Sequence, residues 1–505
     1  MTKGGSMKRN ALLIVMASIL VLFLTTPGFS WQGRMAGMGD ASGLIEDESD
    51  YLIHPAAIAA GQGLNFYGNY RLTYDKASKW DYRMDSPVYH ESFPYTASGS
   101  EWRNEGQLGA AFPLGAGRMG VFFEYTGISG KYTGDEIYNY SSTYVNTYNL
   151  KNTLDNYALR IIYGLPVSSV KLGGELQIAY RTEKKVNYMI DENGYTSTNY
   201  PWANEGSPES NLYPYMVPYN SKYWEAQGKV SVEGLMGAAK YALTLKAGAP
   251  FSSTNNYHYI EENSSSDDFS IEGNVKGWNA GGDFWLRVPV SANMVLPFVV
   301  SAGYKQVKRD GAGTAAWDEY INYDHRTKDI FVKVGGGMDY TPAKGTKIAA
   351  GLYYDYLNTQ QNIFFGPYYW SSGSTYSDIY SAIPDQTEHR LTLKALAEKE
   401  LSPTFVLRGG FNIFYGWVKS EYASAEYYNG TMDDQFAAST SGSNMGVNAS
   451  IGATIKVADV SFEPFINGGY VKYKTSGDGT YYTYPITTEF EKTNWMVGGG
   501  LSVKF

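Results

Sequence analysis

The residues best able to do chemistry are five histidines, and their spacing brings no two of them together. They are His54, His90, His258, His325 and His389. No pair has the spacing of metal ligands, so each is expected to face solvent or to bond locally. The chain has no cysteine, which excludes disulfides, thiolate metal sites, c-type haem attachment and a lipidated N-terminal cysteine. We therefore predict no metal site and no cofactor.

Catalytic motifs are absent too. The sequence contains no G-x-S-x-G, no H-E-x-x-H and no P-loop pattern. Among the histidines, only His389 lies near the start of a predicted strand, and no motif surrounds it. The chain is not expected to be an enzyme.

The first thirty residues have the pattern of a secretory signal peptide. Lys8 and Arg9 precede an apolar run from Ala11 to Leu24, and small residues follow before Trp31. We predict cleavage after residue 30, with an uncleaved membrane anchor as the alternative. Cleavage would remove three cations and no acid, so the net charge would change from −9 to −12. This acidity argues against a nucleic-acid partner.

The remaining sequence alternates between apolar and polar residues with period two. From Lys171 to Arg181 and from Tyr223 to Glu233, even positions are mostly apolar and odd positions mostly polar or charged. The chain has 46 tyrosines, 56 glycines and 11 tryptophans, and no later apolar run is long enough for a membrane helix. Long alternating strands whose polar faces carry charges are typical of a transmembrane β-barrel. A soluble β-sandwich also alternates, but its strands are usually shorter.

Turns and longer connections also alternate along the chain. Seven short turns are predicted at 114–117, 165–170, 236–239, 289–293, 341–345, 401–403 and 456–459. Eight long polar connections are predicted near 75–104, 127–152, 182–220, 249–268, 311–326, 359–386, 424–442 and 473–486. Outer-membrane barrels have short periplasmic turns and long outer loops. We therefore predict an all-β, antiparallel up-and-down transmembrane barrel of about sixteen strands, with fourteen as the alternative.

The last strand supports this location. Apolar residues alternate from Trp495 to the terminal Phe505, which resembles the C-terminal recognition signal of bacterial outer-membrane barrels. The predicted location is the outer membrane of a Gram-negative bacterium. The predicted partners are outer-membrane lipid, lipopolysaccharide and the barrel-assembly machinery.

The stretch from Gly33 to Leu64 differs from the alternating remainder. Its residues GMGDASGLIEDESDYLIHPAAIA resemble the N-terminal signature of the long-chain fatty-acid transporter (FadL-like) superfamily. His54 stands where that family usually has asparagine, and Ala57 where it usually has glycine. The resemblance implies that residues 31–63 form a plug inside a barrel of residues 64–505, although the family usually has fourteen strands. The plug candidates are Gly37, Met38, Gly39, Asp40, Glu46, Asp47, His54 and Pro55. A disordered tail or a periplasmic arm are the alternatives.

Two further groups of residues are candidates for contact with a solute. Cations expected on the lumenal face are Arg71, Arg160, Arg181, Lys229, Arg287, Arg390 and Arg408. They either pair across strands and hold the plug, or form strips that guide an anion. Outer-loop aromatics are Tyr368, Tyr369, Trp370, Tyr376, Tyr427 and Tyr428. They either receive an amphipathic solute or pack against one another over the barrel mouth.

The resemblance implies an outer-membrane channel for passive uptake of hydrophobic or amphipathic small molecules, fatty-acid-like or aromatic, gated by the plug. One alternative is a general porin for small polar solutes. Another is a barrel scaffold for a secretion or surface-protein partner.

Overall fold

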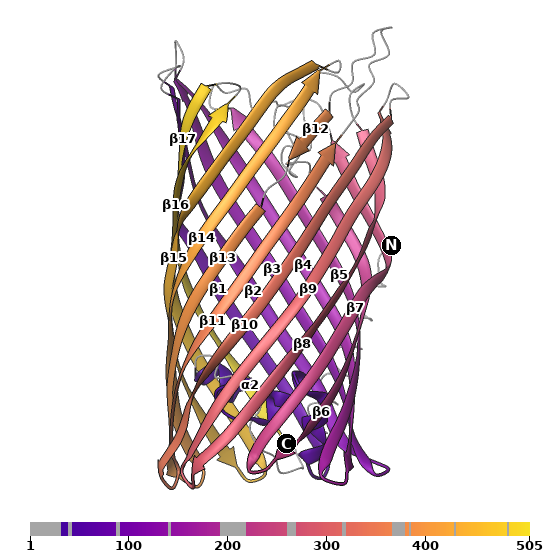
Figure 1. The fold of residues 1–505 in the computed structure, drawn as a ribbon, viewed down its shortest axis with the longest axis vertical. Coiled ribbons are helices and arrows are strands. Elements are labelled where there is room, and N and C mark those ends of the chain that lie inside the picture. Colours follow the sequence, from indigo (N-terminus) through magenta and orange to yellow (C-terminus); the bar gives the residue numbers. More distant parts are fainter. Residues whose placement is uncertain are drawn as a thin grey trace, which may run out of the picture.

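The computed structural model is a closed antiparallel barrel (Figure 1). It describes residues 32–38, 43–86, 91–139, 143–191, 219–259, 269–315, 320–365, 379–382, 385–428, 431–481 and 484–505. The predicted signal peptide at 1–30 lies outside these ranges. The described residues before the barrel form three short helices: α2 (Gln32–Gly37), η1 (Glu48–Leu52) and η2 (Pro55–Ala60).

The strands pair in chain order around the ring. They are β1 (Asn65–Ser86), β2 (Glu91–Leu114), β3 (Gly117–Asn139), β4 (Thr143–Val167), β5 (Val170–Asp191), β6 (Tyr219–Met236), β7 (Ala239–Tyr259), β8 (Phe269–Ser291), β9 (Met294–Ala315), β10 (Tyr320–Ala343), β11 (Thr346–Phe365), β12 (Ile379–Ala382), β13 (Asp385–Ser402), β14 (Phe405–Tyr428), β15 (Thr431–Val457), β16 (Val460–Tyr481) and β17 (Tyr484–Lys504).

The short strand β12 occupies the same place in the wall as β13. Both pair with β11 on one side and β14 on the other, and β12 continues the register of β13. The wall therefore has sixteen strand positions. The prediction of sixteen is confirmed, and the alternative of fourteen is wrong.

The first and last strands close the ring. Phe66 and Phe505 exchange two backbone hydrogen bonds of 3.2 Å, and β1 pairs with β17 along nearly its whole length. A bilayer offers no partner for an exposed strand edge, so closure is a condition for a β wall in a membrane. All seven predicted short turns lie at one end of the barrel, where the C-terminus also lies.

The outer surface carries an apolar band that begins at these short turns. On β14 the exposed residues Leu407, Phe411, Ile413 and Tyr415 share one face, and Trp417 completes the row. The row spans about a dozen residues, which at ~3.3 Å per residue and a tilt of ~45° covers about 28 Å. That height matches the hydrocarbon core of an outer membrane.

Aromatic side chains mark the upper edge of the band. They form an aromatic girdle of Trp102, Trp224, Trp278, Trp417 and Trp495, each in contact with a tyrosine at ring-centroid distances of 4.5, 5.0, 4.8, 5.1 and 4.6 Å. Trp and Tyr favour the membrane–water interface because they combine an apolar ring with a polar group. The short-turn half of the barrel is therefore the part suited to the bilayer.

Above the girdle the strands continue, and here the predicted connections were wrong in extent. The connection expected at 127–152 is mostly strand, since β3 runs to Asn139 and β4 begins at Thr143. The connection expected at 75–104 is likewise mostly β1 and β2. Beyond the bilayer both faces of a strand can meet water, so the alternation disappears while the backbone pairing persists.

The ladder between β7 and β8 is interrupted near the girdle. No pairs form between Gly248 and Asn255 on β7, a stretch that includes Pro250, which has no N–H to donate. The hydroxyl of Ser253 accepts a hydrogen bond from the N–H of Val275 (2.8 Å) and donates one to its carbonyl (3.0 Å). A side chain thus replaces part of the missing backbone pairing.

The position of the bilayer can be tested with single cysteines, because the chain has none of its own. Ile466 and Lys474 lie on the same outer face of β16, below and above the girdle. In intact proteoliposomes we expect a membrane-impermeant maleimide to label Lys474→Cys but not Ile466→Cys, although Ile466 is 63% exposed in the isolated barrel. Detergent should expose both. Equal labelling in the membrane would contradict this placement.

Candidate functional site

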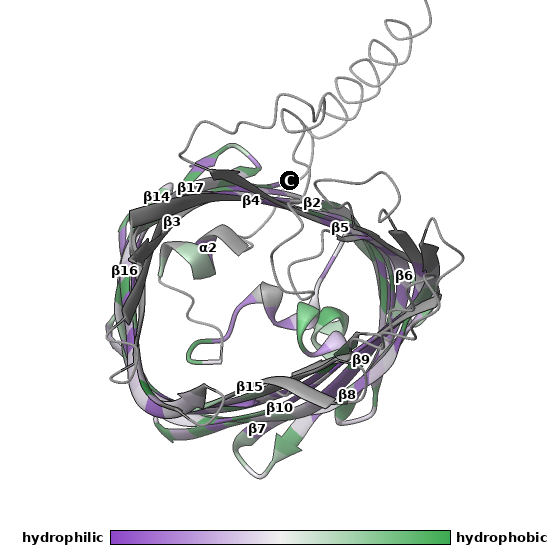
Figure 2. Cartoon of the chain, turned by 90° about the horizontal axis from the view of Figure 1, so that it is seen from above, coloured by the Kyte–Doolittle hydropathy of each residue, from purple (hydrophilic) through white to green (hydrophobic). Residues whose placement is uncertain are grey.

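The N-terminal residues 32–38 and 43–64, termed the lumenal segment, lie inside the barrel (Figure 2). The helix α2 packs against β14 to β17, and η2 packs against β3 to β6 on the far side of the ring. The wall contacts lie close to the short turns. The segment therefore crosses the lumen at the short-turn end.

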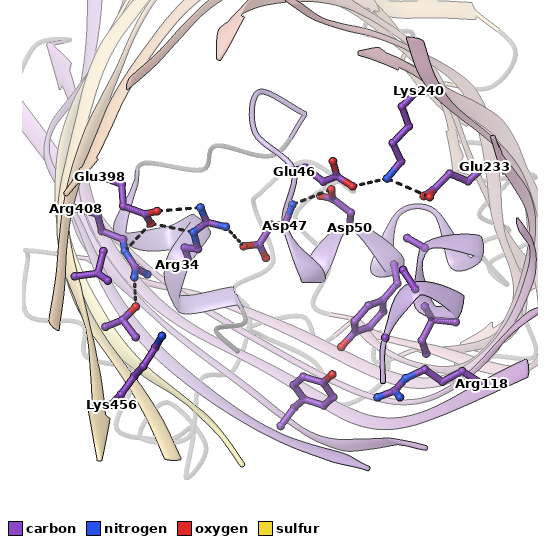
Figure 3. A pocket seen from close by; sticks show the side chains of 18 residues that line it. Arg34, Glu46, Asp47, Asp50, Arg118, Glu233, Lys240, Glu398, Arg408 and Lys456 are labelled. Atoms are coloured by element: carbon purple, nitrogen blue, oxygen red, sulfur yellow. Dashed lines mark hydrogen bonds and ion pairs between the residues drawn. The ribbon is translucent and has the colours of Figure 1, made fainter. Parts of the chain in front are cut away.

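One end of the segment is held by a buried guanidinium (Figure 3). The Nε and Nη2 of Arg34 donate to the carboxylate of Glu398 on β13 at 2.9 and 3.0 Å, and Nη1 donates to Asp47 at 3.0 Å. Burial opposes the charge of Arg34, but Asp47 and Glu398 outweigh it and raise its pKa. Glu398 also faces Arg408 at 3.5 Å. Removing one member of such a network leaves a buried charge without compensation.

The other end is held by cations of the wall. Lys240 on β7 bridges Glu46 of the segment and Glu233 of β6. The side chains of Arg160 and Lys229 donate to the backbone carbonyl of Leu52 at 3.2 and 2.6 Å. That carbonyl ends the helix η1, where partial negative charge collects and cations are favoured.

Glycines in the wall make room for the segment. A Cβ on Gly173 of β5 would stand 2.1 Å from the backbone nitrogen of Ala56, and one on Gly410 of β14 would stand 2.2 Å from the carbonyl oxygen of Met38. Both distances are far inside van der Waals contact. Beside Gly173, the Ala56 N–H donates to the hydroxyl of Ser231 at 2.6 Å. The wall is therefore shaped to the backbone of this segment.

His54 is bonded locally. Its Nδ1 lies 2.7 Å from the hydroxyl of Thr244, and its ring packs edge-on against Trp285 at 4.3 Å. It is 1% exposed, and burial lowers its pKa to about 4. At neutral pH His54 is thus a neutral side chain joining the segment to β7 and β8.

Asp50 lies on the same turn of chain and is also buried. Its carbonyl accepts the N–H of His54 at 2.7 Å, and its carboxylate accepts the N–H of Asp47 at 3.0 Å. Burial raises the pKa of the Asp50 carboxyl to about 8, and the negative charge of Asp47 adds to this shift. In Glu46, by contrast, burial is outweighed by the hydrogen bond and charge of Lys240, which lower the pKa.

The other plug candidates lie as follows. Gly37 ends α2, and Met38 is buried with Met35, Leu44 and Ile45 against the wall. Pro55 is the first residue of η2 and is buried. Gly39 and Asp40 fall outside the described residues.

Each of the seven predicted lumenal cations has a polar partner on the same face. Besides Arg160 and Lys229, Arg71 faces Glu105 at 3.8 Å, Arg181 donates to the Tyr223 hydroxyl at 2.8 Å, Arg287 faces Asp339 at 3.7 Å, Arg390 faces Asp355 at 3.7 Å, and Arg408 faces Glu463 at 3.3 Å. This geometry fits pairing across strands better than a free cationic strip. Whether any of them guides a solute stays a prediction.

The outer-loop aromatics are not placed by the structure. Tyr368, Tyr369, Trp370 and Tyr376 lie outside the described residues. Tyr427 and Tyr428 end β14, where only their backbone is described, paired with Met432 and Thr431. Their role in receiving a solute stays a prediction.

Among the cavities that the described residues line against the lumenal segment, two are large. One, of about 500 Å³, is lined by Arg34, Glu46, Asp50, Arg118 and Lys240. Another, also of about 500 Å³, has apolar lining from Met35, Ala36, Leu52, Ile53 and Phe465 and polar lining that includes Arg71, Glu105, Glu124 and Arg160. The second cavity, termed the upper cavity, thus combines apolar and charged surface.

Several residues that form this site were missed in the sequence. Arg34 is the one cation in a predominantly acidic stretch, and that contrast could have identified it. Lys240, Thr244 and Arg118, which donates to the carbonyl of Gly63 at 2.6 Å, carry no local signal. They act only through contacts between distant parts of the chain.

The pKa of Asp50 predicts that docking of the segment weakens between pH 6.5 and about 8. Asp50 is protonated in the docked segment below pH 8 but ionised when released, so docking is favoured at low pH and loses about 1.4 kcal/mol per pH unit until about pH 8. His54 does not contribute, since both its docked and its ordinary pKa lie at or below 6.5. We expect proteolysis of the segment, relative to Asp50→Asn at each pH, to rise across this window. A constant ratio would contradict the prediction.

Two adjacent glycines provide a matched test of the fit between wall and segment. Gly173 faces the segment, whereas a Cβ on Gly174 would meet nothing nearer than 3.8 Å. We expect Gly173→Leu to accelerate proteolysis of the segment about tenfold, since overpacking costs ~1–3 kcal/mol. Gly174→Leu should behave as wild type, and both barrels should keep their heat-modifiable migration. The fit is disproved if both variants protect the segment equally.

Comparison with known proteins gives similarity in fold only. No protein-family model and no curated protein matches the chain. Similar solved structures include a Pseudomonas aeruginosa FadL homologue (10% identity, 96% of this chain and 99% of that chain, TM-score 0.41), the Pseudomonas putida toluene transporter TodX (10%, 95% and 98%, 0.38) and the Ralstonia pickettii toluene transporter TbuX (12%, 94% and 98%, 0.35). At these identities and TM-scores the comparisons carry no argument about the fold. The barrel fold is instead shown by the continuous closed sheet of the structure itself. The chain is similar along nearly its whole length to a FadL homologue and to toluene transporters, and at this identity the similarity does not transfer a substrate.

Proposed function

We propose that the chain is an outer-membrane channel for passive uptake of hydrophobic or amphipathic small molecules, with the lumenal segment as its gate. The observation that carries the proposal is the upper cavity. Its apolar floor is made largely by the segment itself, through Met35, Ala36, Leu52 and Ile53, and charged residues of the wall surround that floor. Such a surface suits a solute with an apolar body and a polar end.

A gate must be held and must also be able to move. The segment is fixed by ion pairs and by donors from the wall, together with apolar clusters that it shares with the wall. Net energies of such polar contacts are modest because water competes for each group. A solute that displaces Leu52 from the upper cavity would loosen the residue whose carbonyl Arg160 and Lys229 hold.

The two alternatives are less well supported. A general porin needs an open water-filled pore, whereas here the segment crosses the lumen. A scaffold for a protein partner needs no fitted lumenal segment, and Gly173 and Gly410 show such a fit. The outer membrane as location, and lipid, lipopolysaccharide and the assembly machinery as partners, are part of the proposal.

Reconstituted vesicles separate these functions. We expect the wild type to accelerate entry of a fluorescent long-chain carboxylate about tenfold over protein-free vesicles, while swelling in arabinose stays at background. Deletion of residues 33–63 should leave a folded barrel that swells in arabinose. Sugar permeability of the wild type would favour the porin, and no flux of either solute in both proteins would favour the scaffold; each result would overturn the proposal.

A further inference from the structure

A basic patch lies on the outer surface of β8, β9 and β10, immediately above the aromatic girdle. Lys276 on β8 pairs in register with Lys308 on β9, and Lys308 pairs with Arg326 on β10. Lys328, two residues further along β10, pairs in register with Gln306 on β9, which in turn pairs with Trp278 on β8. Three neighbouring strands thus place four cations in two adjacent rows.

These side chains point outward rather than into the lumen. On β8 the exposed residues Trp278, Phe284 and Val290 have the same parity as Lys276, and on β10 Ile330 and Val334 have the same parity as Arg326 and Lys328. The side chain of Lys276 is 63% exposed. By contrast Arg309, next to Lys308, reaches Glu183 on β5 at 3.7 Å through the lumen.

Two acids hold part of the patch in place and leave a surplus of positive charge. Asp310 contacts Lys276 at 3.2 Å and Lys308 at 3.1 Å. Asp324 contacts Lys308 at 3.1 Å and binds Arg326 through both carboxylate oxygens at 3.0 and 2.8 Å. Four cations face two carboxylates, so the patch carries a net charge of about +2 at neutral pH.

The row of cations and the row of acids lie at different distances from the membrane, which lies on the girdle side of the patch. The cations Lys276, Lys308 and Arg326 lie nearer the girdle, and Asp310 and Asp324 pair with each other one row further out. Two residues of a tilted strand correspond to about 5 Å of height. The positive row therefore lies at the depth of lipid head groups, with the acids displaced toward water.

We propose that this patch binds the phosphorylated head of an outer-leaflet glycolipid, with its acyl chains lying along the apolar band below. Phosphate oxygens accept charge-assisted hydrogen bonds from ammonium and guanidinium groups. The indole of Trp278, which contacts Tyr304 at 4.8 Å, lies where the head meets the chains. This site is on the outside of the barrel and does not depend on the proposed transport, but it rests on the proposed outer-membrane location.

Two other outer-surface lysines differ from the patch because each forms an ion pair with a single acid. Lys419 on β14, two residues above Trp417, contacts Glu421 at 2.5 Å. Lys472 on β16 is matched by Glu491 on β17 at 2.9 Å. These two ion pairs are neutral, whereas the four cations of the β8–β10 patch share two acids.

The test removes the excess while keeping the ion-pair network. Lys276→Gln with Lys328→Gln leaves Lys308, Arg326, Asp310 and Asp324 in place. The matched control is Lys222→Gln with Lys474→Gln, which removes equal charge from exposed, outward-facing positions on β6 and β16. Binding of bisphosphorylated lipid A to the full barrel in micelles is measured by native mass spectrometry, with thermal unfolding as the check on folding.

We expect the patch variant to bind lipid A about tenfold more weakly than wild type, and the control variant to bind within about twofold. On wild type, the same glycolipid without phosphates should bind as weakly as lipid A binds the patch variant. Inorganic phosphate at ~10 mM should not displace lipid A, which excludes a site for the free anion. Equal binding by the patch variant, an equal loss in the control, or tight binding of the phosphate-free lipid would each overturn the proposal.

Discussion

The whole molecule depends on the closure of the ring by the backbone hydrogen bonds between β1 and β17, which end at Phe66 and Phe505. Within a bilayer no other group can satisfy a strand edge, so the sheet must meet itself. Closure creates an outer face for lipid and an inner face for water, and the alternation of side chains follows from it. A ring of sixteen strands also encloses more space than its own side chains can fill. The residues that precede β1 occupy part of that space.

Ion pairs and close backbone contacts both fix these residues, and the two have different roles. Ion pairs such as Arg34 with Glu398, and Lys240 with Glu46, orient the segment at opposite walls. Glycines such as Gly173 allow the two backbones to approach. Apolar clusters that the segment shares with the wall add to docking, and the buried charges of the segment still need compensating partners. A gate held by such contacts is sensitive to small changes in charge. Asp50 is a group of this kind, because burial in the lumen raises its pKa to about 8.

The sequence predicted what is encoded locally. Turns such as those at Gly237 and Gly345, where φ is 62° and 69°, follow from residues that favour left-handed backbone, and the apolar band follows from alternation. Above the girdle water reaches both faces, the pattern ends, and strand was mistaken for loop. Glu46, Asp47, His54 and Pro55 were found through a family resemblance. The partners Arg34 and Glu398 lie 364 residues apart, so their ion pair could not be predicted from local sequence. Gly173 differs from Gly174 only in the face of the strand that it occupies, so its contact with the segment could not be predicted either.

The central claim is that the lumenal segment rests against the wall and must move for a solute to pass. A disulfide tests it directly, because the chain has no other cysteine. Ala56 and Ser231 are joined by a 2.6 Å hydrogen bond, so Ala56→Cys with Ser231→Cys should cross-link on oxidation. Uptake of a long-chain carboxylate into vesicles is then measured before and after reduction. We expect oxidation to block uptake and reduction to restore it. Failure to cross-link, or full uptake through the cross-linked barrel, would contradict this expectation.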